Sequence, residues 1–222
     1  MNPISPPKTP NELLERAGLI AGRSLAELAH TQAQSVPDNL LHAKGWVGQL
    51  IEQCLGASAG SRAEPDFPEL GIELKTIPLN ANGSPKETTY VCTVPLNEPA
   101  TSWETCWLRQ KLNQVLWLPI EAAAELPVAQ RRVGSAILTQ LSREQDVQLK
   151  QDWHEHMELI ATGRIDEICA HHGTYLQIRP KAANHKALRE TTDADGRTIK
   201  TLPRGFYLRT TFTADILARH YL

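Results

Sequence analysis

Two carboxylates and an ammonium group lie close together in the stretch from Asp66 to Pro78. Asp66 precedes Glu73 by seven residues, and Lys75 follows Glu73 at the second position. This Asp-x6-Glu-x-Lys spacing is typical of metal-dependent nucleases, in which two carboxylates hold Mg²⁺ and the lysine orients or activates the attacking water. Short motifs also match many chains by chance, so an edge strand with a solvated charged face is the alternative interpretation.

The alternating pattern around the motif predicts that a short strand carries it. Side chains two residues apart share one face of a strand, so Ile72 and Leu74 would enter a core. Glu73 and Lys75 would then share the opposite face. A proline and a glycine lie between Asp66 and the strand, and the bend that they favour would bring the carboxylate of Asp66 up to Glu73.

Length and composition are those of an ordinary globular protein. At 222 residues, the chain can bury a real core as one domain or as two closely packed lobes. Its 41% apolar and 22% charged residues argue against a largely disordered chain. The four cysteines form no C-x-x-C pair, so we expect reduced thiols and neither a zinc site nor a disulfide framework.

Targeting signals are not evident in the sequence. The first ten residues contain prolines but no apolar segment of the kind found in signal peptides. No apolar run reaches the length needed to span a membrane, because Glu and Pro interrupt the best candidate, residues 116–128. We therefore expect a cytoplasmic protein with no membrane partner.

Charge is distributed unevenly along the chain. The formal net charge is −2, but residues 179–209 contain eight Lys and Arg against three acids, which gives +5 there and −7 elsewhere. A basic segment on an acidic body indicates one phosphate-binding surface. Residues 182–200 have few large apolar side chains, so we expect a long loop that orders on DNA; a solvated loop is the alternative.

Capping and periodicity predict the remaining elements. We expect helices from Pro10 to about Leu19, after Ser24, and over residues 46–55. The turn at 80–84 and a strand at 88–94 would form a hairpin with the motif strand. Further expected elements are a buried central strand at 115–120 that ends at a proline, a long polar helix from Ser142 to about Thr162, strands at 175–179 and 206–209, and a short helix from Thr213 to His220.

Other chemical motifs in the chain are weaker. His154 and Glu158 share a helical face, but no H-E-x-x-H spacing and no third ligand accompany them, which favours a solvated surface. The pairs His171-His172 and Asn184-His185 have the wrong spacing for a compact His-Asn-His nuclease unit. No G-x-x-x-x-G-K-[ST] loop is present, so ATP hydrolysis is not expected of this chain.

The sequence around the motif resembles that of the MutH family of methyl-directed mismatch-repair endonucleases, which are related to restriction enzymes. The resemblance extends over nearly the whole chain. It rests on the blocks Pro65 to Pro78, Gly45 to Gly48, Leu55 to Gly60, Ala129 to Ser135, Ile178 to Asn184, and Leu202 to Tyr207.

The resemblance implies a restriction-endonuclease-like α/β fold with a mixed central sheet flanked by helices. Residues 1–222 would form a single endonuclease domain, with the metal site in an N-terminal lobe and a DNA-reading loop at 179–207 in a C-terminal lobe. Proteins of this family nick the unmethylated strand at hemimethylated GATC sites. They use Mg²⁺, for which Mn²⁺ or Ca²⁺ can substitute in binding, and they are activated by MutS and MutL with ATP. One-strand nicking implies a monomer on double-stranded DNA.

Family membership would also assign roles to individual residues. Asp66, Glu73 and the carbonyl of Leu74 would hold the metal. Glu52 and Lys111 match an additional active-site carboxylate and a second lysine, although alone they look like surface residues. The positions expected to contact DNA are Lys44, Glu87, Tyr90, Arg179, Pro180, Lys181 and Tyr207. Tyr90 stands where a related aromatic residue is usual.

Two other functions use the same residues. A stand-alone GATC restriction endonuclease would cut both strands of unmodified DNA without helpers. A non-catalytic DNA- or partner-binding protein on the same fold would have no use for the metal cluster. The intact Asp66, Glu73 and Lys75 therefore favour an enzyme.

Overall fold

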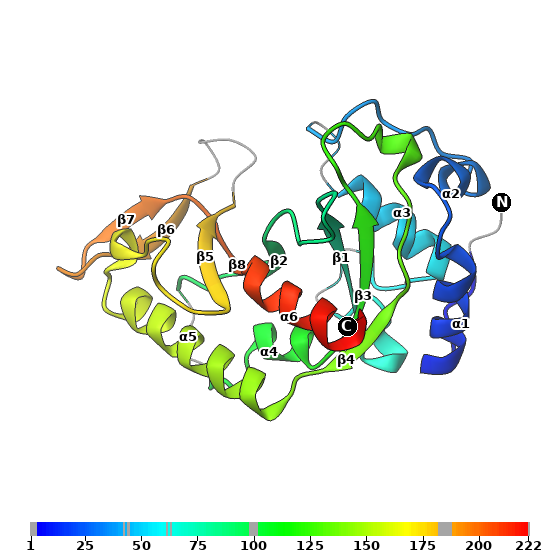
Figure 1. The fold of residues 1–222 in the computed structure, drawn as a ribbon. Helices are drawn as coiled ribbons and strands as arrows, with labels where there is room; N and C mark the ends of the chain where they lie inside the picture. Colours follow the sequence, from blue (N-terminus) through cyan, green and yellow to red (C-terminus); the bar gives the residue numbers. More distant parts are fainter. Residues whose placement is uncertain are drawn as a thin grey trace. The chain divides into compact units, whose positions relative to one another are not determined.

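A computed structural model describes residues 4–41, 43, 45–60, 62, 64–97, 102–181 and 188–221 of the chain. It divides into two compact units. Unit 1 comprises residues 1–87, 113–140 and 220–222, and unit 2 comprises residues 88–112 and 141–219. Both units are mixed α/β structures, as the sequence predicted (Figure 1).

Unit 1 packs helices on a small mixed sheet. The helices are α1 (Pro10–Ile20), α2 (Leu25–Thr31) and α3 (Trp46–Leu55). The sheet has the order β1-β3-β4, with β1 (Glu73–Leu79), β3 (Gln114–Glu121) and β4 (Ile137–Gln140). β1 runs parallel to β3 with Glu73 opposite Val115, and β4 runs antiparallel to β3 with Ile137 opposite Trp117.

Local sequence accounts for these helices. The Thr9 side chain accepts a hydrogen bond from the Glu12 backbone N–H, and Pro10 occupies the first turn of α1. Ser24 and Glu27 form a reciprocal capping box at the start of α2. Helix α3 ends before Gly56, which has left-handed backbone angles. The predicted helices are therefore confirmed in place and extent.

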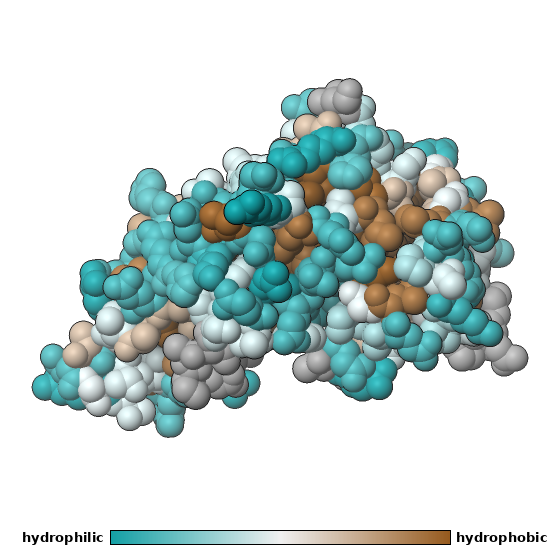
Figure 2. Space-filling model, turned by 90° about the horizontal axis from the view of Figure 1, so that it is seen from below, coloured by the Kyte–Doolittle hydropathy of each residue, from teal (hydrophilic) through white to brown (hydrophobic). Residues whose placement is uncertain are grey.

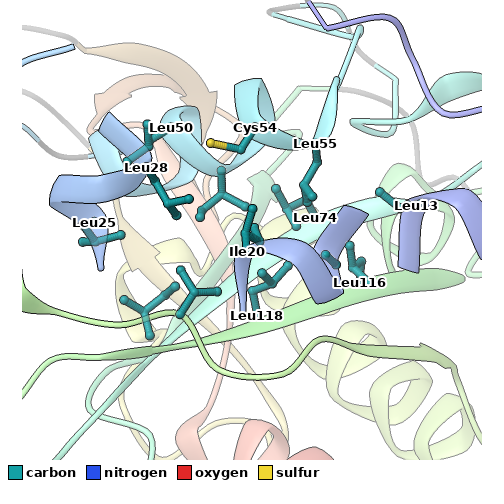
Figure 3. Packing of buried hydrophobic residues seen from close by; sticks show 14 of the residues in the cluster. Leu13, Ile20, Leu25, Leu28, Leu50, Cys54, Leu55, Leu74, Leu116 and Leu118 are labelled. Carbon is teal, nitrogen blue, oxygen red and sulfur yellow. The ribbon is translucent and has the colours of Figure 1, made fainter. Parts of the chain in front are cut away.

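The core of unit 1 lies between the three helices and one face of the sheet (Figure 3). Leu74 of β1 and Leu116 and Leu118 of β3 contribute the sheet side of this cluster. Leu13, Ile20, Leu25, Leu28, Leu50, Cys54 and Leu55 come from the helices. This packing buries Leu74 on one face of β1 and so turns Glu73 and Lys75 to the other face.

Unit 2 is built around a second sheet, with the order β2-β8-β5. Its strands are β2 (Thr89–Thr93), β8 (Arg204–Leu208) and β5 (Leu176–Pro180), and β8 is antiparallel to both neighbours. A separate hairpin pairs β6 (Arg189–Thr192) with β7 (Thr198–Thr201). The helices are α4 (Trp107–Leu112), α5 (Arg143–Ala161) and α6 (Thr210–Tyr221), the last of which ends at the residues counted in unit 1.

The predicted hairpin between the motif strand and residues 88–94 is wrong. The turn forms, with Asn80 N–H donating to the Ser84 carbonyl at 2.9 Å, but β1 takes β3 as its partner and β2 joins β8 in the other unit. A turn sequence predicts that the chain reverses, but it does not decide which strands pair. Pairing depends on burial across the whole sheet.

Three smaller expectations also need correction. Strand β3 continues through Pro119 to Glu121, because Pro119 lies beyond the stretch paired with β4. Residues 189–201 form the β6–β7 hairpin rather than a loop, and its turn is closed by the Asp193 carboxylate, which accepts from two backbone N–H groups. The last helix starts at Thr210, and Thr213 is fully buried within it.

Helix α5 is less solvated than its polar sequence suggests. His156 is fully buried, and its Nε2 lies 3.2 Å from the Leu176 carbonyl oxygen. Burial lowers the pKa of His156, so the ring is neutral at pH 7. The residue therefore anchors α5 to β5, while His154 and Glu158 are exposed on the same helix, as predicted.

The surface shown in Figure 2 is largely hydrophilic, with hydrophobic patches between the polar side chains. Within the described ranges, no helix combines the length and apolar character that a membrane span requires.

Candidate active site and nucleic-acid interface

A tight turn brings Asp66 and Glu73 together. Phe67 and Ile72 pair in an antiparallel bridge, with N–H···O distances of 2.9 and 3.3 Å in the two directions. Gly71 closes the turn with φ of 64°, a left-handed angle that glycine adopts without strain. Phe67 and Ile72 are buried, and side chains alternate along extended chain, so Asp66 and Glu73 follow in register on the other face.

Hydrogen bonds hold Asp66 on both sides. Its Oδ2 accepts from the Leu74 backbone N–H at 2.8 Å, beside Glu73. The Asp66 carbonyl accepts from the N–H groups of Ser58 and Ala59, in the loop that follows α3. The carboxylate of Asp66 is therefore fixed at the start of β1, as the bend in the motif predicted.

Glu73 and Lys75 form a largely buried ion pair. The Lys75 Nζ lies 2.5 Å from Glu73 Oε1, and the two side chains are 14% and 2% exposed. Burying a carboxylate costs several kcal/mol before pairing, and a close ion pair offsets that cost only in good geometry. A hydrophobic pair would stabilise the strand at least as well, so this arrangement points to chemistry rather than to stability.

The oxygen donors at this turn fit a hard divalent cation. Two carboxylates and the Leu74 backbone carbonyl offer only oxygen atoms, the ligand type that Mg²⁺ prefers while it keeps several waters. In the described part of the chain, no group of three or more His, Cys, Asp and Glu side chains gathers as a metal cluster. A metal here would therefore depend on the carboxylate pair, backbone oxygen and water.

Two further candidates lie elsewhere in the chain, Glu52 before this turn and Lys111 after it. Glu52 is half-buried on α3, which packs against β1, and its Oε1 lies near Gly48, one turn earlier in the helix. Lys111 belongs to α4 in unit 2, where its Nζ lies 5.1 Å from the centroid of the Trp107 ring. Their roles beside the carboxylates remain predictions.

A second cluster of predicted site residues gathers on one face of the β2-β8-β5 sheet. Tyr90 lies opposite Tyr207 in register, and their rings meet edge to face with centroids 5.4 Å apart. Lys181 Nζ lies 3.2 Å from the centroid of the Tyr90 ring, and the Arg179 guanidinium lies 5.8 Å from that of Tyr207. Cations above aromatic faces attract the ring quadrupole, which fixes the two basic groups on this surface.

Burial and neighbouring groups act on the phenol of Tyr207. Partial burial, and to a lesser extent Tyr90, raise the pKa of the Tyr207 phenol, while Arg179 lowers it. The phenol is therefore a neutral donor at pH 7. Arg179 is exposed, and its Nη1 donates to Thr88 Oγ1 at 3.0 Å.

The other predicted contact residues have less defined surroundings. Pro180 is exposed at the end of β5 and pairs with Arg204. Glu87 is exposed at the end of a segment of unit 1. Lys44 lies outside the described residues.

Gly205 shapes this face, and sequence reasoning did not identify it. A Cβ at Gly205 would lie 2.9 Å from Cε2 of Tyr90 and 3.0 Å from Cε2 of Tyr207. The two rings therefore fill the space that a side chain at 205 would occupy. No periodicity or capping signal reveals this, because the three residues meet only when β2 pairs with β8.

We predict that Gly205→Ala displaces the tyrosine rings. Overpacking of this kind costs about 1–3 kcal/mol of unfolding free energy. We expect affinity for a GATC duplex to fall at least about tenfold, which corresponds to the same scale of free energy, while affinity for a scrambled duplex is kept. Titrations of both duplexes and a thermal melt measure these effects.

Gly18→Ala is the matched control. Gly18 lies in α1, and nothing lies within 4 Å of an added Cβ. Alanine is favoured over glycine in a helix by about 1 kcal/mol, so this variant should be at least as stable as the parent and should bind both duplexes equally well. Equal behaviour of the two variants would refute a role for Gly205 in the aromatic face.

Comparisons with known proteins identify the family. The family described as DNA mismatch repair enzyme MutH matches residues 55–152. A protein named DNA mismatch repair protein MutH from Escherichia coli strain 55989 is 52% identical over 220 residues, which cover 99% of this chain and 96% of the relative. A protein of the same name from Shigella dysenteriae serotype 1 has the same identity and coverage.

Proposed function

The chain belongs to the MutH family of DNA mismatch repair endonucleases, and on that basis we propose that it is a Mg²⁺-dependent enzyme that nicks the unmethylated strand of hemimethylated GATC sites. The observation that carries the proposal is the Asp66 carboxylate held beside the buried Glu73–Lys75 pair. The restriction-endonuclease-like fold and the divalent-metal chemistry are those of the family. The identity of the metal and the target sequence are the proposed part.

Catalysis would rest on charge placed before the reaction begins. Asp66, Glu73 and the Leu74 carbonyl would hold the cation, and Glu52 would add a further carboxylate. A bound Mg²⁺ supplies Lewis-acid stabilisation of the phosphate and lowers the pKa of water. Lys75, oriented by Glu73, would donate a hydrogen bond to the attacking water. Lys111 would neutralise charge that develops on the phosphate in the transition state.

Recognition of GATC would use the exposed face of the β2-β8-β5 sheet. Arg179 has the fork geometry that binds guanine O6 and N7, and Pro180 and Tyr207 offer apolar contact to a base. Lys181 and Lys44 would contact the DNA. Tyr90 and Glu87 would surround the adenine, where an N6-methyl group removes an amine hydrogen and adds bulk. Methylation of the bound strand would thereby weaken binding.

We also propose the repair partners of the chain. DNA binding and cooperation with other repair proteins follow from membership of a mismatch-repair family. MutL would activate nicking, and MutS would act through MutL. MutL would also supply the ATPase activity, since this sequence contains no phosphate-binding loop motif. The protein would act in the cytoplasm. It would be a monomer, because cleavage of one strand needs one active site.

A nicking assay tests the proposal against both alternatives. Hemimethylated, unmethylated and fully methylated GATC plasmids would be incubated with and without MutL and ATP, in Mg²⁺ or in EDTA. We expect MutL-stimulated nicks in the unmethylated strand of the hemimethylated plasmid, protection of the fully methylated plasmid, and no cleavage in EDTA.

Two outcomes would refute the proposed function. Vigorous double-strand cleavage of unmodified DNA without MutL would identify a stand-alone restriction enzyme. Specific binding without any nicking in Mg²⁺ or Mn²⁺ would identify a non-catalytic DNA-binding protein.

A further inference from the structure

A cavity of about 560 Å³ in unit 2 has a strongly basic lining. It lies beside the edge strand β5, at the start of α6. Among the described residues that line it are three arginines and three hydroxyl-bearing threonines, and no acid. The three arginines are Arg179, Arg204 and Arg209, and the threonines include Thr210 and Thr211. A cavity of this composition attracts an anion.

Arg209 builds one wall of the cavity. Its Nη2 donates to the carbonyls of Ala170 and His172 at 2.6 and 2.7 Å, and its backbone N–H donates to the Tyr175 carbonyl at 2.8 Å. These bonds tie the loop before β5 to the start of α6. The guanidinium is neutralised by no carboxylate among its described hydrogen-bond partners, so its positive charge adds to the field in the cavity.

Arg204 is poorly compensated for a residue so little exposed. Its side chain is 13% exposed, and its ion pair is a 3.5 Å contact with Asp166, whose side chain is 83% exposed. Ion pairs with such solvated partners contribute little to stability. The Arg204 Nε–H is buried and has no acceptor in the described part of the chain. Buried N–H groups are nearly always hydrogen-bonded in folded proteins, so a bound ligand could supply the acceptor.

The remaining lining groups suit a phosphate. Arg179 reaches the cavity from β5 and belongs to the predicted base-reading residues. Thr210 and Thr211 begin the 12-residue helix α6, so hydroxyl groups and the positive end of a helix dipole lie at the same place. Guanidinium groups bind phosphate oxygens in a planar, bidentate manner.

We propose that this cavity binds a backbone phosphate of duplex DNA, next to the base that Arg179 reads. The inference rests on the proposed function and adds a positioning contact to it. Contacts to phosphates set the register of a protein on DNA, while contacts to base edges read the sequence. Arg204 would be the principal ligand, because its buried Nε–H has no described acceptor, its carboxylate partner is largely exposed, and no described carbonyl holds its guanidinium in place as two carbonyls hold that of Arg209.

Salt dependence of DNA binding tests Arg204 directly. Loss of one phosphate contact lowers the slope of log K against log salt by about one, and the loss is the same for any sequence. We expect Arg204→Gln to weaken binding of a GATC duplex and a scrambled duplex equally, by roughly tenfold near 0.15 M salt, with that reduction in slope.

Arg219→Gln is the matched control. Arg219 lies on α6, is half-exposed and pairs with Asp215, so this variant also removes one positive charge and unpairs one carboxylate. We expect its affinity and slope to equal those of the parent. Equal slopes for all three proteins would overturn the proposal, as would a loss confined to the GATC duplex.

A second measurement separates DNA phosphate from a free anion and guards against unfolding. The Nε–H signals of arginine would be followed by NMR during titration with inorganic phosphate at constant ionic strength, and then with duplex DNA. We expect the Arg204 signal to shift with both probes and the Arg219 signal to remain unchanged. A shift with phosphate but not with DNA would identify a free-anion site and overturn the proposal.

The outcomes also separate this inference from the proposed function. If Arg204→Gln unfolds, Arg204→Lys keeps the charge, and we expect it to keep the parental slope with weaker binding. If the unsubstituted protein does not nick DNA but Arg204→Gln lowers the slope of log K against log salt, only the endonuclease assignment is refuted. If the unsubstituted protein nicks DNA normally and Arg204→Gln leaves that slope unchanged, only the phosphate site is refuted.

Discussion

Replacing Glu73 with glutamine is expected to lower the nicking rate at least about a thousandfold, because one preorganised charge is worth 10²–10³ and this change also weakens metal binding. Glutamine keeps the shape of the side chain and can still accept a hydrogen bond from Lys75. It removes the negative charge that a divalent cation requires. Single-turnover nicking of a hemimethylated GATC duplex across a range of Mg²⁺ concentrations measures the effect.

Stability must be separated from chemistry in this variant. Removing one partner of a buried ion pair costs about 3–5 kcal/mol, because the other charge stays buried. Lys75 is only 14% exposed, so Glu73→Gln should also lower the unfolding free energy. Loss of activity in this variant alone would therefore be ambiguous.

The double variant Glu73→Met with Lys75→Met resolves the ambiguity. Replacing a buried ion pair by hydrophobic residues of similar volume is often neutral or stabilising, so we expect unfolding in urea close to that of the parent. Nicking should remain absent. A stable double variant that nicks at the parental rate would refute the assignment of this turn as the active site.

The second large effect is expected at Asp152 of α5, which holds the start of β5. Asp152 is 3% exposed, and its Oδ2 accepts from the backbone N–H groups of Tyr175 and Leu176 at 2.6 and 2.8 Å. Its Oδ1 accepts from Gln148 Nε2 at 2.8 Å. Hydrogen bonds to a charged acceptor contribute about 1.5–3 kcal/mol each, so Asp152→Ala should lower the unfolding free energy by roughly 3 kcal/mol or more.

Urea unfolding and amide hydrogen exchange measure this loss. We expect the protection of the Tyr175 and Leu176 amides to fall most, because they lose their acceptor. Asp152→Asn keeps a neutral acceptor and should cost about half as much, since neutral hydrogen bonds are weaker than charge-assisted ones. Glu158→Ala, at an exposed position of the same helix, should change stability by less than about 0.5 kcal/mol. Similar losses for Asp152→Ala and Glu158→Ala would contradict the anchoring role.

Sequence alone identified the elements whose causes are local. Thr9 and Ser24 begin helices because their side chains cap nearby N–H groups, and Gly56 ends one. The alternation around Glu73 and Lys75 predicted a strand with one buried and one charged face. The Asp66 turn was also predictable, because Phe67 and Ile72 lie only five residues apart and their pairing closes a local loop.

Strand pairing depended on contacts between distant parts of the chain. Motif residues and turn signals indicated a hairpin from β1 to β2, yet β1 pairs with the buried strand β3, and β2 completes a sheet with β8. The same holds for Gly205, whose missing side chain matters only where two tyrosines from different strands meet. His156 is a further case, because its polar neighbours along α5 suggested solvent and its packing against β5 buried it.

One physical cause separates the features that the sequence predicted from those that only the tertiary structure decided. Caps, turns and alternation act over a few residues, so their free energies can be read from the sequence around them. The choice of strand partner, the burial of a histidine and the basic lining of the cavity beside β5 are sums over residues far apart in the chain. Those sums are resolved only when the hydrophobic cores of the two units form.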